Sequence, residues 1–143
     1  MTTPEPITIE AFVPVSPEQA WEAYISPEAI TKWNQASPDW HCPSAQVDLR
    51  VGGRYWARME ARDGSFGFDC EGTYEVVDKP HVLTLRLDDD RLVRTSFTSE
   101  GSGTRVRTVF DPEASNSIEL QRTGWQAILD SYAAYVSKSI QNS

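Results

Sequence analysis

The residues of this chain best suited to nucleophilic or acid-base chemistry lie together in the segment Asp39–Cys42. An imidazole can activate a neighbouring thiol, but only when the two side chains come within hydrogen-bond reach. His41 and Cys42 are adjacent in an extended segment, so their side chains are expected to point in different directions. A metal site built on this pair would need Cys70 and His81 to converge on it from two further segments, which is a weak zinc pattern. The sequence therefore predicts no thiol nucleophile, no metal site and no cofactor.

Composition narrows the function classes further. The 143 residues include 13 Lys and Arg against 21 Asp and Glu, for a formal charge of -8, which argues against the phosphate contacts that provide most nucleic-acid affinity. No stretch approaches the roughly 20 apolar residues that span a bilayer, and the N-terminus lacks the basic and apolar regions of a signal peptide. Only Cys42 and Cys70 are present, so no disulfide framework is indicated. We expect a cytoplasmic protein with neither nucleic-acid nor membrane partners.

Patterns along the chain predict the elements that position these residues. Ile7–Val13 alternates in the way that a half-buried strand requires. Ser16–Gln19 offers an N-cap serine, a proline at the first helical position and a glutamine at the third. Ser26–Glu28 repeats this start signal, so two short helices are predicted, which end near Tyr24 and Trp33.

The middle of the chain is predicted to be rich in strands. Residues 34–44 contain two prolines and no apolar period, which predicts a long loop. Trp33 and Trp40 are expected either to gate the mouth of a pocket or to pack this loop onto the sheet. From Ala45 onward, alternation and turn signals predict six antiparallel strands. In the strand after the Asp63-Gly64 turn, alternation predicts these inward side chains: Phe66, Phe68, Cys70, Tyr74 and Val76.

The C-terminal segment predicts one long helix. Asn116 is the expected cap, Glu119 follows three residues later, and the pattern continues to about Ile140. Its apolar stripe includes Trp125 and Tyr132, so one face of this helix must be buried against the sheet.

Four local motifs resemble those of a known superfamily: Val15–Trp21, Asp48–Tyr55, Glu71–Val76 and the pair Gly124-Trp125. Together with the order of the elements, they resemble the helix-grip fold of the START and SRPBCC superfamily, in the branch related to the activator of heat-shock-protein ATPase. The resemblance implies an α+β fold with a curved seven-stranded antiparallel sheet, two short helices after the first strand and a long C-terminal helix. We expect a single domain over residues 1–143, with residues 1–6 as a flexible N-terminus.

A straight helix of this length cannot follow a twisted sheet everywhere, so a gap is expected between them. Such clefts often hold a small molecule, and we expect an apolar or aromatic ligand here. The alternative, in which large side chains meet and form a solid core, stays open. The predicted ligand-binding residues are Trp33, Trp40, Tyr55, Met59, Phe68, Tyr74, Leu85, Thr95, Phe97, Trp125, Leu129 and Tyr132.

A few polar groups are expected to orient this ligand. Four inward side chains can donate hydrogen bonds from hydroxyl groups without burying a charge: Tyr74, Thr95, Thr108 and Tyr132. Arg50 and Arg94 are the cationic candidates, although alternation directs Arg94 outward. Most other arginines of the strands are expected to pair with acidic residues on the outer face.

Two other function classes stay open. Polyketide cyclases of similar fold use an acid-base residue, but the strands show no inward histidine or paired carboxylates, so an enzyme of this type would depend on a loop residue such as His41. The activators of heat-shock-protein ATPases bind a chaperone, but this chain has one such domain and no second binding module. The outward Trp56 would offer a face for a chaperone partner or for a homodimer.

Overall fold

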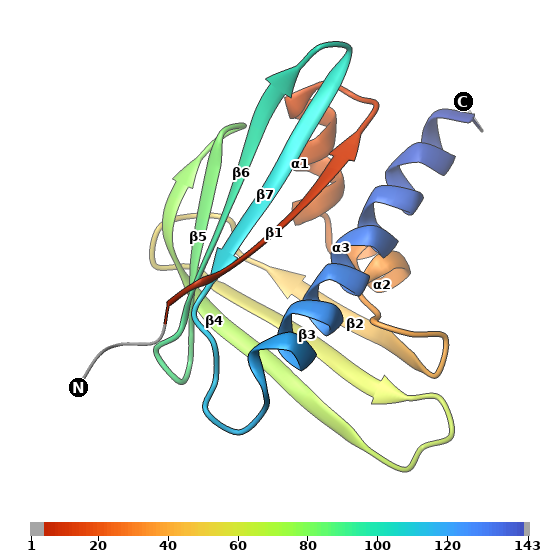
Figure 1. Ribbon diagram of the computed structural model, residues 1–143, viewed down its shortest axis with the longest axis vertical. Coiled ribbons are helices and arrows are strands. Elements are labelled where there is room, and N and C mark those ends of the chain that lie inside the picture. Colours follow the sequence, from red (N-terminus) through yellow and green to blue (C-terminus); the bar gives the residue numbers. More distant parts are fainter. Residues whose placement is uncertain (1–4, 142–143) are drawn as a thin grey trace.

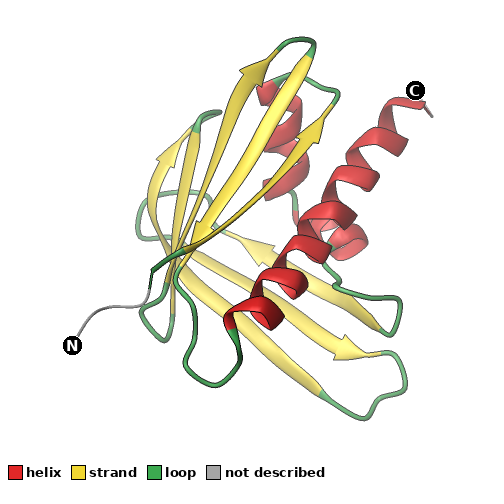
Figure 2. Cartoon of the chain, viewed as in Figure 1, coloured by secondary structure: helices red, strands yellow, loops and turns green. Residues whose placement is uncertain are grey.

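The computed structural model describes residues 5–141, so residues 1–4 of the N-terminal segment predicted to be flexible lie outside it. Figures 1 and 2 show a curved sheet with three helices. The elements, in chain order, are β1 Ile7–Val13, α1 Pro17–Ile25, α2 Pro27–Trp33, β2 Trp40–Val47, β3 Arg54–Ala61, β4 Gly67–Asp78, β5 Val82–Leu87, β6 Leu92–Glu100, β7 Gly103–Phe110 and α3 Ile118–Gln141.

All seven strands belong to one antiparallel sheet with the order β1-β7-β6-β5-β4-β3-β2. The sheet curls strongly, and α3 crosses its concave side, where it packs against β1 and α2 (Figure 1). The predicted α+β helix-grip architecture is confirmed. None of the helices within residues 5–141 is long and apolar enough to cross a membrane.

Capping residues define the two short helices as predicted. The Ser16 side chain accepts a hydrogen bond from the backbone N–H of Gln19, and the Gln19 side chain accepts one from the backbone of Ser16. Ser26 ends α1 and also caps α2, where its hydroxyl accepts from Ala29 N. Because the two helices share one capping residue, the chain changes direction at Ser26, and α1 contacts β6 and β7 whereas α2 contacts β2.

The start of α3 differs from the prediction by one residue. Ser117, rather than Asn116, caps the helix, because its hydroxyl accepts a hydrogen bond from Leu120 N at 3.1 Å. The side chain of Asn116 instead donates to the carboxylate of Glu113 in the preceding loop. This contact holds the β7–α3 connection against the helix start.

The long loop predicted over residues 34–44 is partly wrong, because β2 begins at Trp40. A proline within a strand pattern argues against a central strand, and Pro43 stands in this one. β2 tolerates it as an edge strand, with a register shift between His41 and Ser44 where the proline falls.

The predicted alternation in β4 holds only near its centre. Tyr74 is buried, but the register against β5 shifts between Tyr74 and Val76, so Val76 is exposed and Val77 packs against the core instead. Phe66 precedes the strand and is also exposed, contrary to its predicted inward position. Alternation fails at both places because a bulge or a hairpin end resets which face a side chain occupies.

The outer face of the sheet carries ion pairs between its arginines and acidic residues, as predicted. Arg58 binds Asp69 and Arg86 binds Glu75 across strands, and Arg58 also binds Glu60 on its own strand. Exposed pairs of this kind stabilise a fold by at most about 1 kcal/mol each, so the buried concave side provides most of the stability.

Candidate functional site

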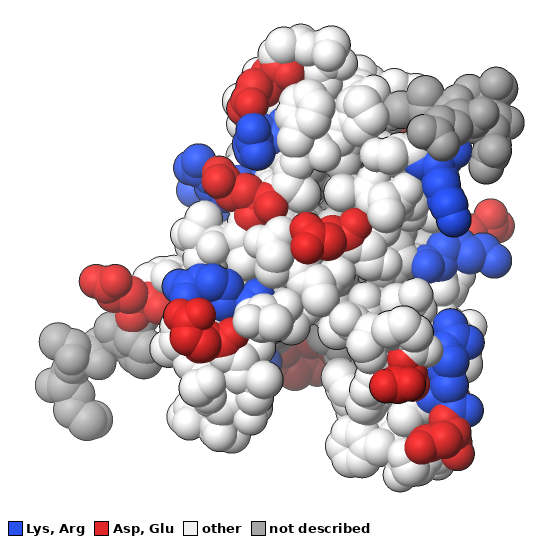
Figure 3. Space-filling model, turned by 45° about the vertical axis from the view of Figure 1, so that its right-hand side comes forward, with Lys and Arg blue, Asp and Glu red and all other residues white. Residues whose placement is uncertain are grey.

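A cavity of about 470 Å³ lies between α3 and the concave face of the sheet. Strands β3 to β6 form its floor, the first half of α3 forms its roof, and α1 and α2 close one end. Phe68 and Leu120 line it while staying 45% and 60% exposed, so they mark its mouth. Figure 3 shows the molecule hollowed between two lobes at its lower edge.

The cavity stays open because α3 presents a glycine to it. A Cβ atom added at Gly124 would meet nothing within 4 Å. The next residue, Trp125, stacks on Phe110 with ring centroids 3.9 Å apart and planes at 10°, so its indole forms a wall rather than a plug. The solid-core alternative is therefore not what the structure shows.

Nine of the twelve side chains predicted to bind a ligand line this cavity. They come from α2, four strands and α3, which meet only through the fold. The nine are Trp33, Tyr55, Met59, Phe68, Tyr74, Leu85, Thr95, Trp125 and Leu129.

The other three predicted residues, Trp40, Phe97 and Tyr132, lie elsewhere. Trp40 packs against Phe66 and Phe68, with ring centroids 6.0 and 5.9 Å away; we call these three rings the exposed aromatic cluster. Phe97 and Tyr132 are buried behind the cavity wall and pack edge-on against Tyr24. The predicted faces are right for both, but neighbouring aromatic rings separate them from the cavity.

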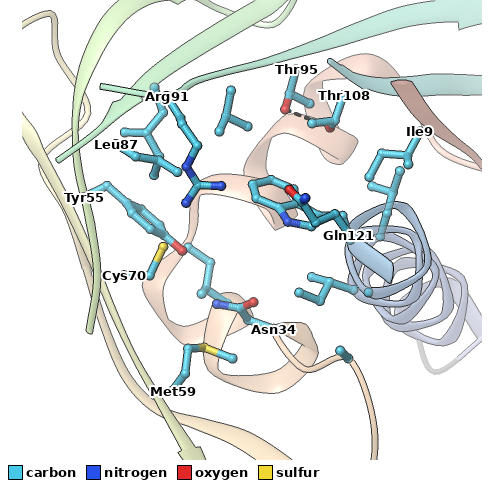
Figure 4. A pocket seen from close by; sticks show the side chains of 18 of the residues that line it. Ile9, Asn34, Tyr55, Met59, Cys70, Leu87, Arg91, Thr95, Thr108 and Gln121 are labelled. Atoms are coloured by element: carbon cyan, nitrogen blue, oxygen red, sulfur yellow. Dashed lines mark hydrogen bonds between the residues drawn. The ribbon is translucent and has the colours of Figure 1, made fainter. Parts of the chain in front are cut away.

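A chain of three hydroxyl groups forms a polar spot in the wall, with contributions from α1, β6 and β7. The hydroxyl of Tyr24 lies 3.1 Å from Thr95 Oγ1, which lies 3.0 Å from Thr108 Oγ1 (Figure 4 shows the threonine pair). Burial raises the pKa of Tyr24, although the hydrogen bonds to the two threonines act in the opposite direction. These three hydroxyl groups are therefore uncharged at neutral pH, and together they can offer one further hydrogen bond to a ligand.

Two more ionisable groups of the wall are also neutral. Burial raises the pKa of the Tyr55 phenol well above its ordinary value, and it raises the pKa of the Cys70 thiol to about 11. A thiol needs its thiolate form to attack a substrate. Tyr55 and Cys70 are accordingly hydrogen-bonding groups near neutral pH, rather than a base or a nucleophile.

Arg91 is a wall residue that the sequence analysis missed (Figure 4). It follows Asp88–Asp90, one of the turn signals that separate the predicted strands. The signal was nevertheless present, because Arg91 is two residues before Val93 and four before Thr95, both inward. Extending the alternation back by one step would have placed it on the concave face.

Gln121 was also missed, and it braces the cavity roof. Its side-chain carbonyl accepts from Glu113 N at 2.8 Å, and its Nε2 donates to the carbonyls of Glu113 and Asn116. It shares the helical stripe of Trp125 and Ile128 at spacings of four and seven residues. A buried amide that holds the β7–α3 connection fixes the position where α3 departs from the sheet.

The segment Asp39–Cys42 does not line the cavity. His41 lies on β2, with Nε2 3.8 Å from Glu60 Oε1, and Cys42 is buried with its thiol donating to Ser44 O at 3.4 Å. Within residues 5–141, no three or more His, Cys, Asp or Glu side chains are grouped to hold a metal ion.

Comparisons with known proteins agree with this architecture. The structure of an AHSA1-like protein from Aeromonas hydrophila matches with 44% identity and a TM-score of 0.88, covering 94% of this chain and 93% of that one. Chr148 from Cytophaga hutchinsonii matches at 41% identity and a TM-score of 0.81, covering 96% of each chain. CV1439 from Chromobacterium violaceum, at 24% identity and a TM-score of 0.82 over 94% of this chain and 99% of that one, shares the fold. Among curated proteins, no match was found.

The family comparison covers nearly all of the described chain. The family described as activator of Hsp90 ATPase homolog 1-like protein matches residues 14–137, a span that runs from the end of β1 into the last turns of α3 and includes most of the cavity wall. The chain therefore belongs to the family of activator of Hsp90 ATPase homolog 1-like proteins.

Proposed function

We propose that this protein binds an apolar or aromatic small molecule in the cavity between α3 and the curved sheet. The family and fold support a ligand-binding or activator-like module in general. The observation that supports small-molecule binding in particular is the cavity, whose volume of about 470 Å³ is within the range of ligand pockets. Its wall combines apolar side chains with a few polar groups, the composition that such pockets use to hold and orient a ligand.

Shape and chemistry favour a flat ligand. Tyr55, Tyr74 and Trp125 bring aromatic faces or edges to the wall, and aromatic pairs are stabilised by offset or edge-on contacts. The hydroxyl chain that starts at Tyr24 supplies a local hydrogen-bonding point. An aromatic molecule with one or two polar substituents would satisfy both features.

The alternative functions draw less support from the structure. His41, the proton carrier on which an acid-base enzyme would depend, is on edge strand β2 and does not line the cavity. Trp56, the proposed face for a chaperone or a second copy, is half-buried on β3. Small-molecule binding is the function that makes use of the cavity between α3 and the sheet.

Gly124 provides the test. N-phenyl-1-naphthylamine, an uncharged fluorescent probe, should bind the native protein with an emission increase. Gly124→Phe should weaken binding by about tenfold or more, equivalent to about 1.4 kcal/mol, because the new ring has open space to enter. Gly124→Ala should keep probe binding and raise the free energy of unfolding by about 0.5 to 1 kcal/mol, since alanine suits a helix interior better than glycine.

Thr123→Phe is the matched control, because it adds the same ring at an exposed position of α3. It should leave the probe affinity unchanged. Equal binding by native protein, Gly124→Phe and Thr123→Phe would show that the probe sits outside the cavity and would refute the proposed function.

A further inference from the structure

Arg91 places a cation in the wall of an otherwise mostly apolar cavity. Its side chain is 25% exposed, and Figure 4 shows its guanidinium pointing into the space between Tyr55 and Gln121. Arginine keeps its charge at any physiological pH. A permanent charge in such a wall needs a partner, and the partners that the protein itself supplies are incomplete.

Asp89 satisfies only one side of this guanidinium. Its carboxylate accepts from Arg91 Nε at 2.8 Å and from the Arg91 backbone N–H at 3.2 Å. Partial burial alone would raise the pKa of Asp89, but these bonds outweigh it and the pKa lies below its ordinary value. Among residues 5–141, the two terminal nitrogens of Arg91 have no hydrogen-bond acceptor. The edge of the planar guanidinium fork that these two nitrogens form is therefore free.

A second polar group of this part of the wall is also a free donor. The Tyr55 hydroxyl has no hydrogen-bond partner within residues 5–141, and it stays protonated because burial raises its pKa. Among the acceptors of the wall, Glu113 Oε1 already accepts from the Asn116 side chain, and the Gln121 carbonyl accepts from Glu113 N. The part of the wall around Arg91 and Tyr55 thus offers free donors to a ligand.

We propose that the ligand of this cavity is an organic anion, with an apolar or aromatic body and an acidic group held by the free edge of Arg91. This inference rests on the proposed function and adds the charge of the ligand to it. A carboxylate or sulfonate can take two parallel hydrogen bonds from the terminal nitrogens of a guanidinium. Asp89 positions the fork by holding Nε, and Tyr55 can donate a further bond to the same acidic group.

Apolar neighbours in the wall would strengthen an ion pair between Arg91 and an acidic group of the ligand. Leu87 and Val93 flank Arg91 in the wall, so an ion pair formed here is less screened by water than one on the surface. The protein carries a formal charge of -8, which disfavours anions at the general surface. The affinity for an anion would therefore depend on Arg91 more than on the net charge of the protein.

Two matched probes separate this inference from the proposed function. 8-anilinonaphthalene-1-sulfonate differs from N-phenyl-1-naphthylamine by one sulfonate group, and both fluoresce in apolar surroundings. Arg91→Gln should lower the affinity for the sulfonate probe by about tenfold or more, the range for a hydrogen-bonded charge, and should change the affinity for the neutral probe by less than about twofold. Arg91→Lys, which keeps the charge and loses the fork, should fall between native protein and Arg91→Gln.

Arg94→Gln is the control, because it removes the same charge three residues away on an exposed position of β6. It should leave both affinities unchanged, and the thermal midpoint of each variant reports whether it is folded. Equal weakening of both probes by Arg91→Gln, or no effect on the sulfonate probe, would overturn the anion inference while neutral binding kept the proposed function. Failure of both probes to bind native protein would remove the proposed function and this inference with it.

Discussion

Trp21→Ala is expected to lower the free energy of unfolding by about 3 to 5 kcal/mol, the range for removing a buried aromatic side chain. Trp21 is fully buried on α1 and meets Phe97 edge-on, with ring centroids 5.5 Å apart. It couples α1 to the concave face, so its loss should loosen the end wall of the cavity as well. Chemical denaturation followed by circular dichroism measures the change.

Trp21→Phe is the informative comparison. The indole N–H of Trp21 has no hydrogen-bond partner within residues 5–141, and an unpaired buried donor is destabilising. Phenylalanine keeps a ring and removes that donor, so this variant should lose clearly less stability than Trp21→Ala. Val51→Ala is the control at a position that is 65% exposed, and it should change the free energy of unfolding by less than about 0.5 kcal/mol. A loss below 1 kcal/mol for Trp21→Ala would contradict the packing described here.

Gly53→Ala is expected to lower the free energy of unfolding by about 3 kcal/mol, at the upper end of the range for overpacking. A Cβ atom at Gly53 would lie 2.0 Å from the carbonyl oxygen of Asp48, which is backbone and cannot rotate away. The Gly53 carbonyl also accepts from Tyr74 N at 2.9 Å. Relief of the clash would shift the start of β3 and, with it, Tyr55 and Tyr74 in the cavity floor.

Gly52→Ala separates steric overlap from backbone conformation. Gly52 has a φ of +86°, and its added Cβ would meet nothing within 4 Å. The Gly52→Ala substitution should lower the free energy of unfolding by about 1 to 2 kcal/mol, because alanine must adopt the left-handed conformation. Urea denaturation of both variants should place Gly53→Ala below Gly52→Ala in stability, and the reverse order would contradict the close approach to Asp48.

Much of the fold could be predicted because its signals are local. The capping box at Ser16 and the shared cap at Ser26 each fix a helix start within four residues, and alternation in Ile7–Val13 fixes the phase of β1. Where pairing between strands decides the outcome, local signals fail. Pro43 argued against a strand that only its edge position permits, and Val76 was placed on the wrong face because the bulge beside Tyr74 depends on β5.

The cavity could be predicted only in part, for a related reason. Alternation and helical periodicity identify the side chains that face inward, which is why most of the predicted wall residues line it. Whether facing side chains touch is decided by distances that no local pattern contains. Phe97 and Tyr132 face inward and still sit behind other rings, whereas Trp125 leaves the space open because Phe110 provides a stacking partner.

Chemical-shift mapping with N-phenyl-1-naphthylamine on the ¹⁵N-labelled protein tests the central claim most directly. Binding in the cavity predicts the largest shifts at the backbone amide of Gly124 and at the backbone and indole N–H groups of Trp125, and Gly124→Phe should strongly reduce the Trp125 shifts at the same probe concentration. Trp40 and Phe66, in the exposed aromatic cluster, should shift little. Shifts confined to Trp40 and Phe66, or Trp125 shifts that persist unchanged in Gly124→Phe, would show that the probe binds the surface and that the space under α3 is not a ligand site.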